Sequence, residues 1–163
     1  MIRIRRARLE DLPAITKIYN DAIIKTVATF DTKPKSIEEQ KEWFEKHGER
    51  YPILVAEIDN KVVGWTSLSE WSDRCAYSDT AEISLYIEEG YRGRGIGKKL
   101  TETILREGKA AGLHTIIARV TEGNDQSIHI LEKYGFNYIG IMKEVGRKFG
   151  KLFDVHLLQK IFE

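Results

Sequence analysis

The sequence predicts one mixed α/β domain whose central sheet is mostly antiparallel and is flanked by helices. Three observations support this fold class. The chain has 163 residues, the size of one typical domain. Segments of strand and helix periodicity follow one another in the order β-α-α-β-β-β-α-β-α-β-β, as mixed folds require. Tight hairpin signals come early and a helical crossover comes late. We therefore expect residues 1–163 to form a single domain.

The first third of the chain is predicted to hold one strand and two helices. Residues 2–5 alternate apolar and charged side chains, which is the pattern of a half-buried strand. Asp11 favours the start of a helix, in which apolar residues at helical spacing continue to about residue 25. After a loop, Ser36 and Glu39 form a capping box. They open a second helix that is expected to end near Gly48.

The middle of the chain is predicted to be β-structure. Ile53–Ile58 and Val62–Ser69 are rich in apolar and β-branched residues. The three residues between them, Asp59-Asn60-Lys61, are a hairpin signal. A polar loop then leads to a third strand at Ala81–Ile87.

The last third is predicted to alternate between helices and strands. A helix over about 96–111 is followed by Gly112, a residue suited to a helix C-terminus. A strand is expected at Thr115–Val120. The remaining elements are a short helix at Gln126–Tyr134 and two strands at about 136–144 and 152–161.

Composition excludes several classes of protein. Lysine and arginine number 26 against 25 acidic residues, for a net charge of +1, so we expect no surface built for nucleic acid or for an anionic membrane. No apolar run approaches the roughly 20 residues of a membrane span. The charged start does not resemble a signal peptide. The only cysteine, Cys75, has no partner for an internal disulfide, and a cytoplasmic location is expected.

The segment from Tyr91 to Lys99 is the sharpest local feature of the sequence. Glycines alternate with other residues between a strand and a helix, so backbone N–H groups could close on a bulky anion. The helix start adds unsatisfied donors. Four cations, Arg92, Arg94, Lys98 and Lys99, lie in the same run. The run fits neither a Walker A loop nor the dinucleotide fingerprint. Its two interpretations are a phosphate site and a basic helix start that binds nothing.

Several motifs together resemble one family. Arg92-x-x-Gly95-x-Gly97 is similar to the pyrophosphate loop of the GNAT N-acetyltransferases, which bind acetyl-coenzyme A. Asn124, Ser127 and the run 133–136 resemble a later segment of that superfamily. A narrower resemblance is to the phosphinothricin and methionine sulfoximine acetyltransferases. It rests on Thr29–Thr32, Trp71–Arg74, Ala76-Tyr77, Glu82–Ile87, Gly123–Asp125, Val145–Gly150 and Asp154-Val155.

This resemblance implies a GNAT fold, acetyl-coenzyme A as cosubstrate, a small amino acid as acceptor and a homodimer. By resemblance, backbone groups of residues 85–87 hold the pantetheine arm. The residues implied to bind the coenzyme are Leu85, Tyr86, Ile87, Arg92, Gly93, Arg94, Gly95, Ile96, Gly97, Lys98, Asn124 and Lys133. Lys148 and Asp154 match the subfamily, but no role follows for them from the sequence.

Glu82 is the candidate general base. Acetyl transfer to an amine needs the amine neutral, and a nearby carboxylate can take its proton. In the third strand Glu82 lies on the face opposite Ile83 and Leu85. From the residues alone, a solvated strand glutamate and a catalytic one are both open. The resemblance favours catalysis, because the proposed base of that subfamily matches Glu82.

The acceptor site is predicted around a polar loop. A guanidinium such as Arg74 can bind a carboxylate or phosphinate through two parallel hydrogen bonds, although a lone loop arginine is also common on a surface. The expected substrate residues are Phe30, Ser72, Asp73, Arg74, Tyr77, Glu82, Ile83 and Ser84, with Trp71 as a further wall. By resemblance, a tyrosine that protonates the leaving thiolate would stand at Leu131. The general acid is therefore unassigned, and Tyr134 does not take the role.

Other functions remain open at this stage. The acceptor could be a protein N-terminus or another amine, and the chain could be a non-catalytic acyl-coenzyme A sensor. Nucleic-acid binding through residues 92–99 is disfavoured, because the basic run is short and lacks interleaved aromatic residues. The four histidines show no metal-ligand spacing, so no metal is expected. Cys75 has no base near it in sequence and is not expected to act as a nucleophile.

Overall fold

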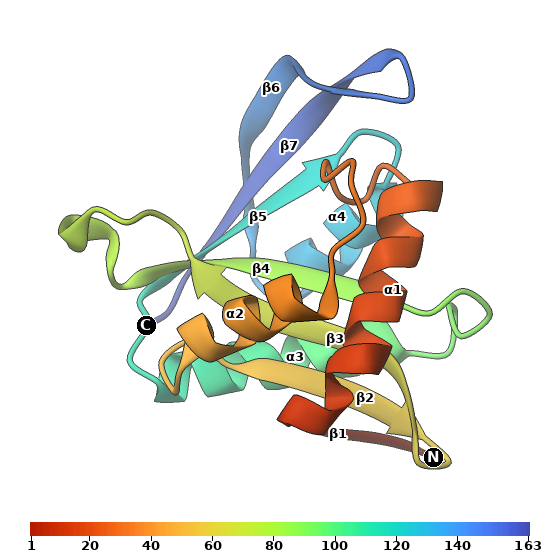
Figure 1. Ribbon diagram of the computed structural model, residues 1–163. Coiled ribbons are helices and arrows are strands. Elements are labelled where there is room, and N and C mark those ends of the chain that lie inside the picture. Colours follow the sequence, from red (N-terminus) through yellow and green to blue (C-terminus); the bar gives the residue numbers. More distant parts are fainter.

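In the computed structural model, residues 1–163 form a mixed α/β fold with a seven-stranded sheet (Figure 1). The strand order is β1-β2-β3-β4-β5-β7-β6. Every neighbouring pair is antiparallel except β4 and β5. The strands are β1 (Ile2–Arg6), β2 (Ile53–Ile58), β3 (Lys61–Glu70), β4 (Thr80–Ile87), β5 (Thr115–Thr121), β6 (Asn137–Lys148) and β7 (Lys151–Ile161). The helices are α1 (Leu12–Lys25), α2 (Ile37–His47), α3 (Ile96–Ala110) and α4 (Asp125–Lys133). This confirms the predicted fold class.

The helices cover both faces of the sheet. Successive side chains of β2 point to opposite faces of the sheet and show this arrangement most simply. Ile53 and Val55 pack in one buried cluster with Ile15 of α1. The residues between them, Leu54 and Ala56, belong to the larger cluster formed with α3 and α4. Figure 1 shows α1 and α2 on one side of the sheet and α3 and α4 behind it. No helix combines the length and apolar character needed to cross a bilayer.

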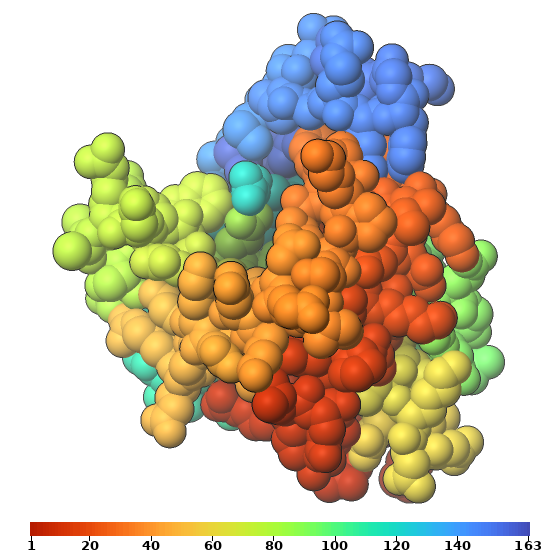
Figure 2. All heavy atoms as spheres, in the orientation of Figure 1, coloured from red at the N-terminus to blue at the C-terminus, as the bar shows by residue number.

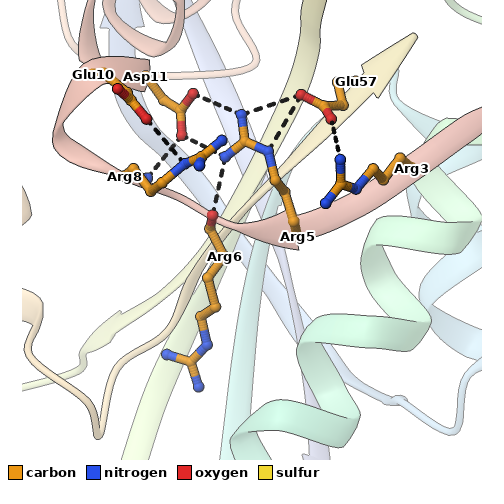
Figure 3. A network of polar contacts seen from close by, with 7 residues as sticks. All are labelled: Arg3, Arg5, Arg6, Arg8, Glu10, Asp11 and Glu57. Carbon is orange, nitrogen blue, oxygen red and sulfur yellow. Dashed lines mark hydrogen bonds and ion pairs between the residues drawn. The ribbon is translucent and has the colours of Figure 1, made fainter. Parts of the chain in front are cut away.

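A network of ion pairs fixes the N-terminal strand (Figure 3). The guanidinium of Arg5 donates to both carboxylate oxygens of Asp11, at 2.8 and 2.9 Å, and to Glu57 of β2 at 3.2 Å. We call these three residues the Arg5 cluster. Their side chains are only 14%, 6% and 10% exposed. As predicted, Asp11 is the N-cap residue of α1, but not through its side chain. Its carboxylate makes no cap bond to α1 and instead accepts from Arg5 and the Arg8 backbone N–H.

The C-terminal hairpin differs most from expectation. The gap predicted between residues 144 and 152 is absent, because β6 continues to Lys148 and β7 begins at Lys151. Register shifts between Tyr138 and Gly140 and between Met142 and Gly146 interrupt the pairing of β6, but the strand continues beyond them. Glu144 adopts a φ of 51° there, and its N–H donates to Asp154 Oδ1 at 2.8 Å. Asp154, which had no role at the level of sequence, thus stabilises an irregular strand.

The two parallel strands separate shortly after they meet. Pairing between β4 and β5 is limited to residues 80–82 with 115–117. Beyond Glu82, β4 remains paired to β3 as far as Ile87, while β5 remains paired to β7 as far as Thr121. Figure 1 shows β4 and β5 diverging from this shared start. The divergence opens the sheet at its centre and leaves backbone groups on two facing edges without strand partners.

Candidate active site

A cleft of about 660 Å³ lies where β4 and β5 diverge. Residues of both strands line it, together with the loop after α1, the starts of α3 and α4, and β6. Figure 2 shows the molecule hollowed between the yellow-green β3–β4 loop, the orange segment before and within α2 and the blue hairpin. The predicted site residues that line this cleft are Phe30, Glu82, Ile83, Ser84, Leu85, Tyr86, Gly97 and Asn124.

The glycine-rich loop leads into α3 beside this cleft. Gly93 and Gly95 have φ values of 78° and 82°, which explains why glycine stands at both positions. A Cβ atom at either residue would meet nothing within 4 Å, so the backbone there faces open space. Helix α3 begins at Ile96, and the N–H groups of its first turn have no helical partners. Arg92, Arg94, Lys98 and Lys99 are exposed around them. This donor set is suited to phosphate groups.

Asn124 lies at the other helix start that faces the cleft. Its side-chain oxygen accepts from the Ser127 N–H at 3.4 Å and caps α4. Leu131, two turns further along α4, also lines the cleft and carries no proton to donate. Tyr134 packs against the larger apolar cluster instead. The structure therefore supplies no general acid at either position.

Glu82 forms an ion pair that the sequence analysis missed. Arg119 of β5 donates to its two carboxylate oxygens, from Nε at 2.6 Å and from Nη2 at 2.7 Å. Glu82 pairs with Ile117 across the parallel strands, and Arg119 lies two residues later on the same face of β5. The Glu82 side chain is 20% exposed and that of Arg119 is 52% exposed. The hydrogen bond to Glu82 raises the pKa of Arg119, so the guanidinium is charged at every working pH.

Phe30 is held against the C-terminal hairpin. Its ring lies where a Cβ atom on Gly146 would stand, at 2.1 Å, so only glycine fits at that position. The buried Lys148 donates from Nζ to the Thr29 carbonyl oxygen at 2.7 Å, and burial lowers its pKa. Thr121 donates to the Val27 carbonyl oxygen at 2.7 Å. These contacts give Lys148 a structural role in fixing the loop that carries Phe30.

Two tyrosines extend this wall of the cleft. The Tyr19 hydroxyl is 3.0 Å from Thr29 Oγ1 and also donates to Asp31. Burial raises the pKa of Tyr86 to about 12, and the charges of Asp31 and Glu82 act in the same direction. Burial also raises the pKa of Tyr19, together with the hydrogen bond to Asp31. Both phenols therefore keep their protons at neutral pH.

Some predicted residues lie away from the cleft. Ser72, Asp73, Arg74 and Tyr77 belong to the β3–β4 loop, which projects from the body in Figure 1. None of the four lines the cleft. Cys75 is exposed on the same loop. Lys133 is exposed near the end of α4 and does not line the cleft either. No three His, Cys, Asp or Glu side chains lie close enough to hold a metal ion.

Comparisons with known proteins identify the family of this chain. Residues 13–136 match the acetyltransferase (GNAT) family. An L-methionine sulfoximine/L-methionine sulfone acetyltransferase of Pseudomonas aeruginosa is 35% identical over 158 residues, which cover 96% of this chain and 92% of the relative.

Solved structures are similar over almost the whole chain. A phosphinothricin acetyltransferase of the GNAT superfamily from Sinorhizobium meliloti, in complex with AcCoA, has a TM-score of 0.95 and 32% identity, covering 99% of this chain and 88% of that one. A ribosomal-protein-alanine N-acetyltransferase from Brucella melitensis has a TM-score of 0.95 and 35% identity, with 98% and 99% coverage.

Proposed function

Because the chain belongs to the GNAT acetyltransferase family, we propose that it moves the acetyl group of acetyl-coenzyme A to the α-amine of a small amino acid. Methionine sulfoximine, methionine sulfone and phosphinothricin are the model acceptors, as the names of similar enzymes suggest. The observation that carries the proposal is one continuous cleft. It joins Gly97, at the end of the anion-binding loop, to the carboxylate of Glu82.

Acetyl-coenzyme A is the cosubstrate, and the residues present fit its charged end. Gly93 and Gly95 leave the backbone open to a bulky anion, and the cations around the start of α3 complement its charge. We assign the phosphates to residues 92–98. Leu85, Tyr86 and Asn124 line the same cleft, and we assign the pantetheine arm to the strand edge over residues 85–87 and to Asn124. Bound there, the thioester supplies an activated acetyl group.

Glu82 is assigned the role of general base. An ordinary ammonium is protonated at neutral pH and must lose its proton before it attacks a thioester. Glu82 is partly exposed in the cleft and can take that proton directly or through a water molecule. Direct transfer is favoured because Cys75, the only thiol, lies outside the cleft. The thiolate of coenzyme A can leave as an anion, since thiols have a pKa near 8.5.

The assembly expected for this function is a cytoplasmic homodimer. Large apolar side chains are exposed on the C-terminal hairpin, which supports an interface between two copies. They are Tyr138, Ile139, Ile141, Val145, Phe149 and Leu152. The predicted substrate role of Arg74 stays a prediction. Since Arg74 lies outside the cleft of its own chain, that role requires a movement of its loop or the cleft of a second copy.

A second candidate acceptor is a protein N-terminus. The similarity to a ribosomal-protein-alanine N-acetyltransferase favours it, at 35% identity over 98% of this chain. Thiol release from acetyl-coenzyme A, measured with amino acids and with peptides, separates the two acceptors. Turnover with methionine sulfone, methionine sulfoximine or phosphinothricin but not with peptides supports the proposal. Turnover with peptides alone replaces the acceptor, and coenzyme binding without turnover indicates a sensor.

The variant Glu82→Gln tests the assignment of the base. It keeps the size of the side chain and a partner for Arg119, but it cannot take a proton. We expect kcat to fall about 100-fold or more, the usual scale for loss of a general base. Affinity for acetyl-coenzyme A, measured by calorimetry, is expected to stay the same. An unchanged kcat at neutral pH would show that another group accepts the proton.

A further inference from the structure

The guanidinium of Arg119 has one edge occupied and one edge free. An arginine carries five N–H donors around a plane. Glu82 takes Nε and one side of Nη2, and Arg119 makes no other hydrogen bond with a protein side chain or carbonyl. The edge formed by Nη1 and Nη2 therefore remains available. Such an edge matches a second carboxylate with two parallel hydrogen bonds.

The residue that carries this free edge, Arg119, lines the cleft. Arg119 is half exposed there, and its guanidinium carbon lies 5.6 Å from the ring centre of Trp71. Among all residues that line the cleft, Arg119 is the only lysine or arginine. The acidic lining residues are Asp31 and Glu82. An acceptor that brings its own negative charge into this cleft thus finds a single cationic partner.

We propose that Arg119 binds the α-carboxylate of the acceptor with its free edge while its other edge holds Glu82. The inference rests on the proposed function and names the part of the acceptor that is recognised. The amine and carboxylate of an α-amino acid share one carbon atom. A carboxylate fixed beside Glu82 through a common guanidinium therefore brings the amine next to the base. Because the hydrogen bond to Glu82 keeps Arg119 charged, both carboxylates share one permanent cation.

The arrangement makes Arg119 a specificity-determining residue. An acceptor whose carboxylate is replaced by a neutral amide loses the charge-assisted contact and leaves the free edge to water. The N-terminal residue of a peptide has the same deficiency, since its carbonyl group is part of an amide bond. The cleft should for this reason prefer free amino acids to peptides.

The experiment compares L-methionine sulfone with its carboxamide in the thiol-release assay. The quantity measured is the ratio of kcat/KM for the acid to that for the amide. We expect Arg119→Gln to lower this ratio about 10- to 100-fold, the scale of a lost hydrogen bond to a charged group. The ratio cancels any general effect of the substitution on Glu82, because both acceptors use the same base. Arg119→Lys keeps a charge without the second edge and should lower the ratio to a smaller extent.

Arg6→Gln is the matched control. Arg6 forms a half-exposed pair with Glu107 at 3.0 Å, and neither residue lines the cleft, so its loss should leave the ratio unchanged. Melting curves and calorimetry with acetyl-coenzyme A verify that each variant is folded and binds the coenzyme.

The inference is overturned if Arg119→Gln keeps the wild-type ratio, or if the wild-type enzyme does not distinguish acid from amide. If Arg74→Ala lowers the ratio of kcat/KM for the acid to that for the amide and Arg119→Gln does not, Arg74 binds the carboxylate. A wild-type protein inactive on every amine would refute the proposed function itself.

Discussion

The molecule contains two arginine–carboxylate sites of similar chemistry and opposite surroundings. In the Arg5 cluster, one guanidinium bridges Asp11 and Glu57, and all three side chains are nearly inaccessible (Figure 3). In the cleft, Arg119 holds Glu82 alone and is half exposed. The first arginine has a protein carboxylate on each of two sides, whereas the second has one carboxylate partner and no other hydrogen bond within the protein.

The difference indicates what each site does. In the Arg5 cluster the charges are removed from water and must be satisfied within the protein, so their arrangement is closed. It joins β1 to the turn before α1, six residues later, and to β2, 52 residues later in the sequence. The Arg119 pair stays partly hydrated and keeps spare hydrogen-bonding capacity. A closed site contributes to stability, and an open site of the same chemistry is free to bind a ligand.

Removing the shared cation of the closed site is expected to have the largest effect on stability. Arg5→Gln leaves the buried carboxylates of Asp11 and Glu57 without their common partner. We expect a loss of about 3–5 kcal/mol in the free energy of unfolding, the scale for breaking a buried ion pair. Denaturation by urea measures it. At a temperature where the variant is folded, kcat should be unchanged, because the cluster does not line the cleft.

The exposed arginine of the same strand is the control for this loss. Arg3 also pairs with Glu57, at 3.3 Å, but its side chain is solvated. Arg3→Gln should cost less than about 1 kcal/mol. Equal losses in Arg3→Gln and Arg5→Gln would mean that burial does not distinguish the two contacts.

Acid should weaken the closed site through Asp11. Burial alone would raise the pKa of Asp11, but hydrogen bonds from Arg5 and from the Arg8 backbone outweigh it and lower the pKa below its usual 3.8. The folded protein therefore binds this proton less readily than the unfolded chain does. The stabilisation is complete above about pH 4 and is lost as the pH falls through the folded pKa.

The variant Asp11→Asn removes this titration. Unfolding free energies measured between about pH 5 and pH 3 should fall less steeply in the variant than in the wild-type protein. The variant is expected to be less stable than the wild type at pH 7 and to approach it in acid. Parallel curves for the two proteins would show that Asp11 does not contribute to the acid sensitivity.

The sequence predicted the fold well because most elements are local patterns. The alternation of residues 2–5 predicted β1, and the capping box of Ser36 and Glu39 is present at the start of α2. The same alternation could not show that Arg5 is buried, because the residues that cover it come from the turn before α1 and from β2. The ends of the two C-terminal strands were mispredicted, because contacts between the strands determine where β6 ends and β7 begins. The bulge at Glu144 depends on Asp154, which lies ten positions away on the partner strand.

The sequence predicted only those residues of the candidate site that belong to recognisable motifs. Glu82, Phe30 and Asn124 line one cleft, and their roles stay predictions. Arg119 was missed because it lies between the buried residues Ala118 and Val120. A charged residue at such a position is typical of the solvent-facing side of a strand. Its partner Glu82 is 37 residues away. Only the short parallel pairing of β4 with β5 brings the two together, and no local pattern specifies that register.

The smallest expected change in stability is that of Arg119→Gln, and it compares the open site with the Arg5 cluster most directly. Arg119→Gln removes a bidentate pair with shorter contacts than those of Arg5, 2.6 and 2.7 Å. If contact distance decided stability, this variant would be at least as damaging as Arg5→Gln. Because water can replace Arg119 around the partly exposed Glu82, we expect the free energy of unfolding to change by less than about 1 kcal/mol. Urea denaturation of both variants under the same conditions makes the comparison. A loss near that of Arg5→Gln would place the Arg119 pair among the structural contacts and would weaken its assignment to acceptor binding.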